Sequence, residues 1–164
     1  MAKKMDAFSA ALMADKREII FAPTIYKFAD FAAMAEEFKL GERDVVLTNE
    51  FIYKPFMEEL DLKCQFVFQE KFGAGEPSEE MIQTMFDAIP YDSYDRVIAV
   101  GGGAIMDLCK LLGIKRPDTV HNLYFKRFPV IHEKDVIAIP TTCGTGSECT
   151  NISVAIVKDE KDGV

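Results

Sequence analysis

The chain has 164 residues, 49% of them hydrophobic and 28% charged, which is typical of one globular domain with a sizeable core. It carries 27 Asp and Glu residues against 19 Lys and Arg residues, so its formal net charge is −8. This acidic balance argues against nucleic acids and anionic membranes as partners, although backbone amides at a helix N-terminus can still bind an anion.

The hydrophobic pattern alternates between short apolar runs, which are typical of strands, and segments with helical spacing. In chain order we expect a strand over 18–22, a helix over 27–39, a strand over 44–48, a helix over 55–60, a strand over 64–69, a helix over 79–88, a strand over 96–100, a helix over 104–112, and strands over 136–139 and 152–157. Residues 1–17 are interpreted as an extension outside this fold, with a short helix over 2–16. Strands that alternate with helices indicate a parallel α/β sheet.

Individual residues mark the ends of the expected helices. Gly41 and Gly113 are expected to end the helices that precede them. Asn49 is expected to cap the next helix, with Pro55 in the first turn of that helix, and Ser78 is expected to cap the helix over 79–88.

The cysteines and the N-terminus predict the compartment. The four cysteines form no C-x-x-C pair, and His121 and His132 are not at zinc-site spacing from them. We therefore expect four reduced thiols in a cytoplasmic protein, with a reactive thiol at Cys143 as the alternative. The first residues lack the apolar centre of a secretion signal, and no apolar run in the sequence is long enough to span a bilayer.

Gly101, Gly102 and Gly103, which we call the glycine turn, join a buried strand to a helix. Glycine permits a positive φ and lets a ligand approach the backbone without a Cβ in the way. The amides at the start of the helix then suit a pyrophosphate. A tight turn without a ligand is the alternative, since the segment lacks the later glycine of a G-x-G-x-x-G motif.

Asp107 and Lys110 lie one turn apart on the helix that follows the glycine turn. An i, i+3 ion pair on a partly exposed face accounts for both residues. Because Asp107 falls in the first turn of the helix, it can instead orient the glycine turn or face a ligand.

Residues 140–148, which we call the threonine turn, follow the next buried strand and are rich in hydroxyls. Thr141, Thr142, Thr145 and Ser147 place four hydroxyls within seven residues, with two glycines to bend the chain. A turn that only caps a helix is the alternative, but a cap needs a single hydroxyl. We therefore interpret the turn as a binding segment for ribose, phosphate or nicotinamide. Ligands of open α/β sheets bind at the carboxyl ends of the strands, which predicts one site for both turns.

The segments Gly101-Gly-Gly-x-x-x-Asp-x-x-Lys110 and Pro140-Thr-Thr-x-Gly-Thr-Gly-Ser-Glu148, and the distance between them, resemble the iron-containing (group III) alcohol dehydrogenases. The segments 41–53 and 69–78 are most similar to the 4-hydroxybutyrate dehydrogenase branch. The resemblance covers about 18–164. It implies a Rossmann-like parallel sheet flanked by helices, as in the N-terminal domain of dehydroquinate synthase-like proteins. Residues 18–164 would then form an NAD(P)-binding domain, truncated before a helical metal-binding domain.

The resemblance also implies a set of cofactor-binding residues. They are Asn49, Gly101, Gly102, Gly103, Ala104, Asp107, Thr141, Thr142 and Thr145. The glycine turn would hold the pyrophosphate, with Ala104 where the family usually has Ser. Asn49 stands where the family has an acid that binds the adenosine ribose. Asn still hydrogen-bonds a ribose hydroxyl but repels a 2′-phosphate less, so NAD is expected and NADP stays an alternative.

The family holds Fe²⁺ or Zn²⁺ with one Asp and three His of its helical half, so the resemblance implies no metal ligand and no catalytic residue in this chain. His121 and His132 are interpreted as single surface histidines. The intact enzyme would reversibly oxidise 4-hydroxybutyrate to succinate semialdehyde, with the metal polarising the substrate oxygen and NAD taking the hydride. The 164-residue chain alone is expected to be inactive.

Two other functions stay open at this point. One is a dehydrogenase of another primary alcohol or diol, and the other is a standalone nucleotide-binding module without catalysis. The partners implied for the dehydrogenase are a small alcohol or aldehyde, with no nucleic acid and no membrane, and a homodimer or higher oligomer at full length.

Overall fold

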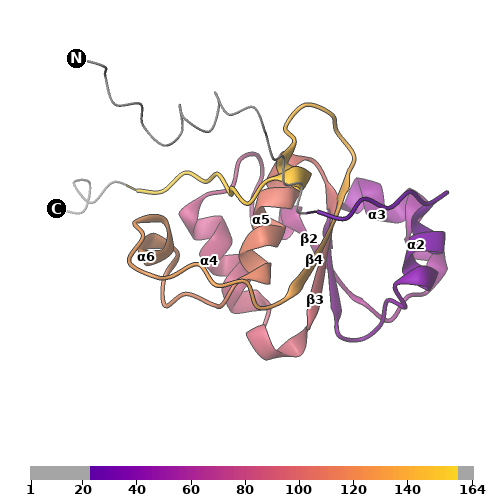
Figure 1. Ribbon diagram of the computed structural model, residues 1–164, viewed down its shortest axis with the longest axis horizontal. Helices are drawn as coiled ribbons and strands as arrows, with labels where there is room; N and C mark the ends of the chain where they lie inside the picture. Colours follow the sequence, from indigo (N-terminus) through magenta and orange to yellow (C-terminus); the bar gives the residue numbers. More distant parts are fainter. Residues whose placement is uncertain (1–22, 159–164) are drawn as a thin grey trace, which may run out of the picture.

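The structure, a computed structural model, describes residues 23–158 and contains a parallel sheet with helices on both faces (Figure 1). The strands are β1 (Asp44–Thr48), β2 (Gln65–Phe68), β3 (Arg96–Gly101) and β4 (Asp135–Pro140). The α-helices are α2 (Phe31–Glu37), α3 (Glu50–Phe56), α4 (Glu79–Ala88), α5 (Gly103–Gly113) and α6 (Val120–Tyr124). Short 3₁₀ turns are η1 (Glu58–Leu60), η2 (Gln69–Lys71), η3 (Tyr91–Ser93) and η4 (Ser147–Cys149). The expected extension over 1–17, its helix over 2–16 and the strand over 18–22 lie outside the described residues.

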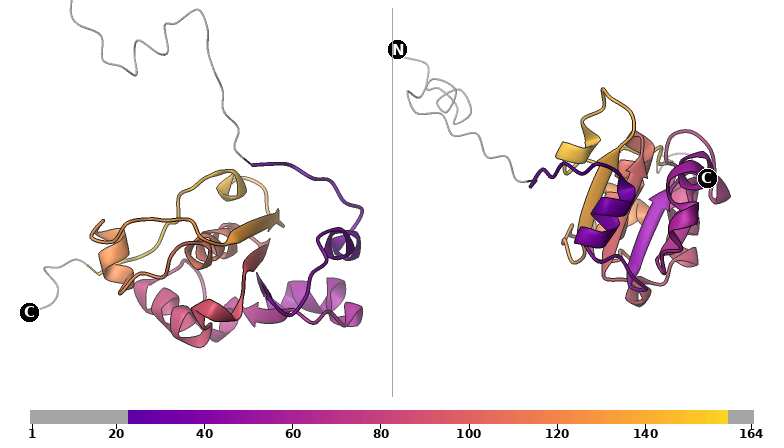
Figure 2. Two further views of the ribbon diagram at one scale, coloured as in Figure 1. Left: turned by 60° about the horizontal axis from the view of Figure 1, so that its bottom comes forward. Right: turned by 90° about the vertical axis from the view of Figure 1, so that its right-hand side faces the viewer.

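All four strands run parallel in the order β2-β1-β3-β4, which confirms the predicted fold class. The central pair aligns Val46 with Ile98, and Ile98 aligns in turn with Ile137 of β4. β1 is buried along its whole length, as expected for a continuous apolar strand that is covered on both faces. β4 lies at one edge of the sheet, as Figure 2 shows.

Alternate side chains of the central strands enter two separate cores, because successive residues of a strand point to opposite faces. Val45 and Leu47 pack in the larger core with α4, α5 and α6. Val46, Ile98 and Val100 pack in the smaller core with α2 and α3. Figure 1 shows these two helical layers on either side of the sheet.

The best-predicted helix is α4, which spans the expected residues 79–88. The Ser78 hydroxyl accepts a hydrogen bond from the Met81 amide (3.2 Å), which satisfies one of the free amides at the helix start. α5 begins one residue earlier than expected and ends at Gly113, as predicted.

The expected helix over 27–39 is too long, and its predicted cap is wrong. α2 begins after Asp30, whose carboxylate accepts from the Ala33 amide (2.8 Å), and it ends at Glu37. Lys39, not Gly41, adopts the left-handed conformation with φ of 51°, and the next amide donates back to the Ala35 carbonyl (2.9 Å). This closure of the last turn leaves Gly41 outside the helix end.

Two further elements differ from the prediction. α3 begins directly after Asn49, so Pro55 lies in its last turn and not in a first turn. The expected helix over 55–60 is replaced by the end of α3 and by η1.

The apolar segment 152–157 forms no strand and shares only a single bridge, from Ile156 to Ser78. A strand needs a partner along its length, and a hydrophobic pattern cannot show whether one is present. The short helix α6 was not predicted, although Thr119 caps it through the Asn122 amide (3.1 Å).

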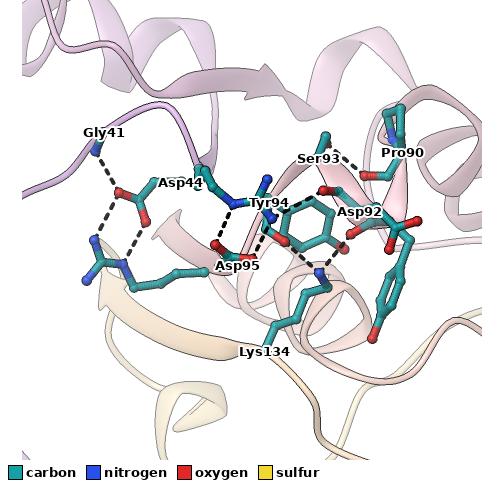
Figure 3. A network of polar contacts seen from close by, with 11 residues as sticks. Gly41, Asp44, Pro90, Asp92, Ser93, Tyr94, Asp95 and Lys134 are labelled. Atoms are coloured by element: carbon teal, nitrogen blue, oxygen red, sulfur yellow. Dashed lines mark hydrogen bonds and ion pairs between the residues drawn. The ribbon is translucent and has the colours of Figure 1, made fainter.

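Paired charges close the amino edge of the sheet (Figure 3). Asp44, only 6% exposed, accepts from Arg96 Nε (2.7 Å) and from the Gly41 amide (2.7 Å). Lys134 Nζ donates to the carbonyl oxygens of Tyr91 (2.7 Å) and Tyr94, and burial lowers its pKa. These contacts fix the starts of β1, β3 and β4 relative to one another.

Within residues 23–158, no helix is both long enough and apolar enough to cross a membrane.

Candidate functional site

Three neighbouring strands end at the carboxyl edge of the sheet with the segments that the sequence singles out. β1 ends before Asn49, β3 runs into the glycine turn, and β4 runs into the threonine turn. Since β1, β3 and β4 are neighbours in this order, the three segments lie in a row. One groove of about 1730 Å³ extends from this edge to Arg96 and Asp135 at the amino edge. Six of the predicted cofactor-binding residues line it, Asn49, Gly102, Gly103, Ala104, Thr141 and Thr142, and the other three, Gly101, Asp107 and Thr145, do not.

The two turns lie close together, and threonine side chains occupy the space beside Gly102 and Gly103 where a Cβ would point. A Cβ on Gly102 would lie 3.2 Å from Thr142 Oγ1, and a Cβ on Gly103 would lie 2.9 Å from Thr145 Cγ2. None of the three glycines of the glycine turn has a positive φ. The prediction that these positions need glycine for its backbone conformation is therefore wrong. The expected close approach is present, but the group that approaches the glycines is the threonine turn.

The N-terminus of α5 opens toward the groove. α5 has eleven residues and begins at Gly103, and no side chain caps it at Gly102. Gly103, Ala104 and Ile105 all line the groove, and first-turn amides have no acceptor within their own helix. The positive end of the helix dipole therefore lies at the place where an anionic group would enter.

The threonine turn is exposed in its middle and anchored at its start. The Thr141 amide donates to the Gly101 carbonyl (2.9 Å), which extends the β3–β4 pairing by one bond. Gly144 and Gly146 have φ of 116° and 61°, a region that favours glycine, so the turn needs glycine at both positions. Thr145 Oγ1 accepts from the Ser147 amide (3.3 Å), a local turn contact that leaves Thr141 and Thr142 exposed beside the groove.

Asp107 and Lys110 form the predicted ion pair (3.1 Å) on a partly exposed face, as expected. Asp107 lies beyond the first turn of α5 and not within it, because the helix begins at Gly103. Both Asp107 oxygens have partners, because Oδ1 accepts from the Ser147 hydroxyl (2.6 Å) and Oδ2 accepts from the Val154 amide (3.1 Å). The pair therefore links α5 to the end of the threonine turn. A direct contact of Asp107 with a cofactor stays a prediction.

Asn49 occupies the N-cap position of α3, but its side chain makes no capping hydrogen bond. The side-chain amide instead donates to Gln69 Oε1 at 3.5 Å, across the end of β2. Gln69 is buried, and its own amide donates to the Gly75 carbonyl (3.2 Å). Sequence reasoning missed Gln69 as a residue of the groove, although its position directly after a predicted strand was the available signal.

The groove also has an apolar wall that the sequence did not predict as part of a site. Tyr26 and Phe28 precede α2, Ile52 comes from α3, and Ile137 and Ile139 come from β4. The only signal for this wall was the helical spacing of the aromatic residues near 28–38, which also predicts ordinary core. Such a wall, with polar groups at one edge, suits a ligand that has both flat apolar and charged parts.

Two of the four cysteines are exposed, Cys143 and Cys149, and a reactive thiol at Cys143 stays an alternative. All four cysteines are free, as expected; burial raises the pKa of the Cys64 thiol to about 11 and raises that of Cys109 as well. His121 stacks on Phe125 and lies 3.5 Å from a Glu79 oxygen. Within residues 23–158, no group of three or more His, Cys, Asp or Glu side chains is placed to hold a metal ion.

A parallel α/β sheet with a glycine turn, an uncapped helix start and a hydroxyl-rich turn at one carboxyl edge has its polar backbone groups where open α/β folds commonly bind ligands. The family model of the iron-containing alcohol dehydrogenases matches residues 22–164, and the chain belongs to this family. The iron that the family name implies finds no ligand set in the described residues.

Individual relatives agree with this assignment. The chain is 47% identical over 137 residues to 4-hydroxybutyrate dehydrogenase of Clostridium kluyveri, a match that covers 84% of this chain and 37% of that protein. An iron-containing alcohol dehydrogenase of Thermotoga maritima superposes with a TM-score of 0.58 at 27% identity, covering 73% of this chain and 35% of that one. Sulfoacetaldehyde reductase from Bifidobacterium kashiwanohense, solved with NAD⁺, shares the fold with a TM-score of 0.57 at 19% identity, covering 82% and 46%. The chain thus spans less than half the length of each of these relatives.

Proposed function

We propose that this chain is the cofactor-binding half of an oxidoreductase that uses NAD to oxidise 4-hydroxybutyrate reversibly to succinate semialdehyde. The observation that carries the cofactor assignment is the contact between the glycine and threonine turns at an uncapped helix N-terminus. The substrate assignment is supported by the 47% identity to 4-hydroxybutyrate dehydrogenase.

The order of the strands predicts how NAD would lie. Asn49 at the end of β1 would hydrogen-bond the adenosine ribose. The amides of Gly103 and Ala104 at the start of α5 would bind the pyrophosphate. Thr141 and Thr142 after β4 would hold the nicotinamide end. Cofactor binding would need glycine at position 102, because a side chain there would fill the space between the two turns.

When bound, NAD supplies the hydride chemistry, and the residues of this chain bind and orient it. None of the described residues is assigned an acid–base or nucleophilic step. We expect the chain by itself to bind the cofactor without turnover, since no metal ligand set is present within residues 23–158. The intact protein is expected to be a cytoplasmic homodimer or higher oligomer with a small alcohol or aldehyde as its substrate.

NAD is favoured over NADP at Asn49, but less strongly than a carboxylate would favour it. An amide donates to or accepts from a ribose hydroxyl, whereas a carboxylate would also repel a 2′-phosphate. Glu50, the next residue, is exposed, and its amide donates to Glu70 Oε1 (3.1 Å), which adds a second acidic side chain near this position. Both acids disfavour a phosphate here.

Calorimetric titration of the chain with NAD⁺, and separately with NADP⁺, tests the cofactor assignment. Saturable binding of NAD⁺ that is tighter than binding of NADP⁺ is the expected result. A folded chain that binds neither would refute the assignment of a formed cofactor site to these two turns. The substrate is tested by turnover of 4-hydroxybutyrate against other primary alcohols and diols in the full-length enzyme. A preference for one of those alcohols would support the second candidate function, and binding without any turnover at full length would support a nucleotide-binding module.

A further inference from the structure

We infer that Lys110, together with Asp107, is a positioning residue that anchors the far end of the threonine turn to α5. The Lys110 ammonium has four oxygen atoms around it. They are Asp107 Oδ1 (3.1 Å), Ser147 Oγ (2.6 Å), Thr150 Oγ1 (3.2 Å) and the Ile152 carbonyl oxygen (2.6 Å). Only Asp107 belongs to the same helix.

The sequence separation of these contacts distinguishes an anchor from an ordinary helical ion pair. A surface i, i+3 pair joins two neighbouring side chains and adds a few tenths of a kcal/mol at most. Here the Lys110 contacts with Ser147, Thr150 and Ile152 span 37 to 42 positions. An ammonium has three donors, and all three are taken up by this cage.

Burial supports the same conclusion. The side chains of Lys110 and Asp107 are 18% and 13% exposed, although long charged side chains usually extend into water. Removing charges from water is costly unless partners replace the water, and here hydroxyls and a carbonyl do so. Asp107 completes the cage, because it accepts from the Ser147 hydroxyl and from the Val154 amide.

The threonine turn needs such an anchor because of its own backbone. It contains two glycines with positive φ and is exposed over 141–145. Its start is tied to β3 by the Thr141 amide, and its end is tied to α5 through Ser147. Thr142 and Thr145 lie between these two ends, against the glycine turn. Loosening the far end would therefore release the hydroxyls from the place where the proposed function needs them.

Hydrogen exchange of the chain without nucleotide tests the anchor directly. Lys110→Met keeps the apolar stem and removes the ammonium, and Lys63→Met removes a lysine from an exposed pair with Asp61 as the matched control. We expect amides within 147–154 to exchange at least about tenfold faster in Lys110→Met, with α4 unchanged and the control like the wild type. Unchanged exchange at 147–154, or equally faster exchange in α4, would overturn the inference. Should Lys110→Met fail to fold, Ser147→Ala removes the shared hydroxyl without leaving a charge unpaired, and the same outcomes apply.

Binding of NAD⁺ and AMP by the same variants tests the consequence, which rests on the proposed function. AMP carries the adenosine and one phosphate of NAD⁺ but lacks the nicotinamide half, which the proposed function places at Thr141 and Thr142. We expect Lys110→Met to weaken NAD⁺ binding at least about tenfold and AMP binding less than about twofold. Equal weakening of both, or no weakening of NAD⁺, would overturn the positioning role. A wild-type chain that does not bind NAD⁺ would contradict the proposed function, while the exchange experiment would still decide whether the anchor exists.

Discussion

At the amino edge of the sheet, charged groups bind one another, whereas at the carboxyl edge hydroxyls and backbone amides line one end of a groove that extends to Arg96 and Asp135. Asp44 and Arg96 are paired within the amino edge, and Lys134 donates to two carbonyls there (Figure 3). Thr141 and Thr142 are exposed beside the groove at the opposite edge. Polar groups that satisfy one another stabilise a fold, and polar groups that face solvent in a row are available to a ligand.

The comparison predicts that changes at the carboxyl edge affect binding with little effect on folding. Gly102→Val should abolish NAD⁺ binding, because its Cβ would lie 3.2 Å from Thr142 Oγ1 and its methyl groups would enter the space between the turns. Gly41→Val at the amino edge is the matched control, since a Cβ there meets nothing within 4 Å. Calorimetric titration and thermal unfolding would measure both effects. Normal NAD⁺ binding by Gly102→Val would show that the glycine turn is not the site.

Changes at the amino edge should have the opposite effect. Arg96→Leu leaves the buried Asp44 carboxylate without its cationic partner, and we expect the free energy of unfolding to fall by about 2 kcal/mol. Arg43→Leu breaks the exposed pair with Asp95, which water screens, so it should change the free energy of unfolding far less than Arg96→Leu does. Urea denaturation measures both variants. If Arg96→Leu instead weakened NAD⁺ binding in the folded chain, the functional separation of the two edges would be wrong.

A smaller change at the carboxyl edge should alter selectivity alone. Asn49→Asp places a carboxylate where the adenosine ribose is expected, so the preference for NAD⁺ over NADP⁺ should rise about tenfold. Gln65→Glu adds the same charge at the exposed first residue of β2 and serves as the control. The ratio of the two dissociation constants is the measurement. An unchanged ratio in Asn49→Asp would mean that residue 49 does not reach the ribose.

A pH-dependent effect is expected from Tyr94, which is fully buried beside the amino edge. Its hydroxyl donates to the Leu112 carbonyl (2.9 Å), and burial raises its pKa to about 12. In the unfolded chain Tyr94 loses its proton near pH 10. The unfolded state therefore binds fewer protons between these two pH values, and stability falls as the pH rises through them.

Tyr94→Phe should cost about 1 kcal/mol at neutral pH through the lost hydrogen bond, and it should make the alkaline fall in stability less steep. Denaturant titrations at pH 7 and at several pH values above 9 measure both effects. Tyr53→Phe on α3 is the control. An equally steep alkaline fall in Tyr94→Phe would assign that fall to other groups.

The parts of the fold that sequence predicted well are those that local physics determines. β1 is a continuous apolar run, and α4 begins at a serine whose hydroxyl caps it, so their bounds match the prediction. Both turns of the candidate site were predicted from residue types alone, since glycines and hydroxyls gather directly after buried strands. Their convergence follows from the parallel sheet.

The parts that sequence missed depend on partners far along the chain. Ile152, Val154 and Ile156 look like a strand, yet each is more than 60% exposed because no strand pairs with this segment within the described residues. Lys110 was predicted to pair with Asp107 on a partly exposed face, and its further contacts with Ser147 and Ile152 could not be read from helical spacing. Pro55 was placed at a helix start, whereas α3 begins five residues earlier than that prediction required, at Glu50.

The pairing of β1 with β3 also has a consequence for the time course of folding. Two side-chain contacts between these strands join residues 52 positions apart: Arg96 Nε donates to Asp44, and the Thr48 hydroxyl donates to the Val100 carbonyl. The Arg43–Asp95 pair beside them has the same separation. A loop of that length must close before any of these contacts forms, so the central pair assembles late and slowly. During synthesis, β1 and β2 must therefore wait for residues 96–101 to leave the ribosome before the middle of the sheet can form.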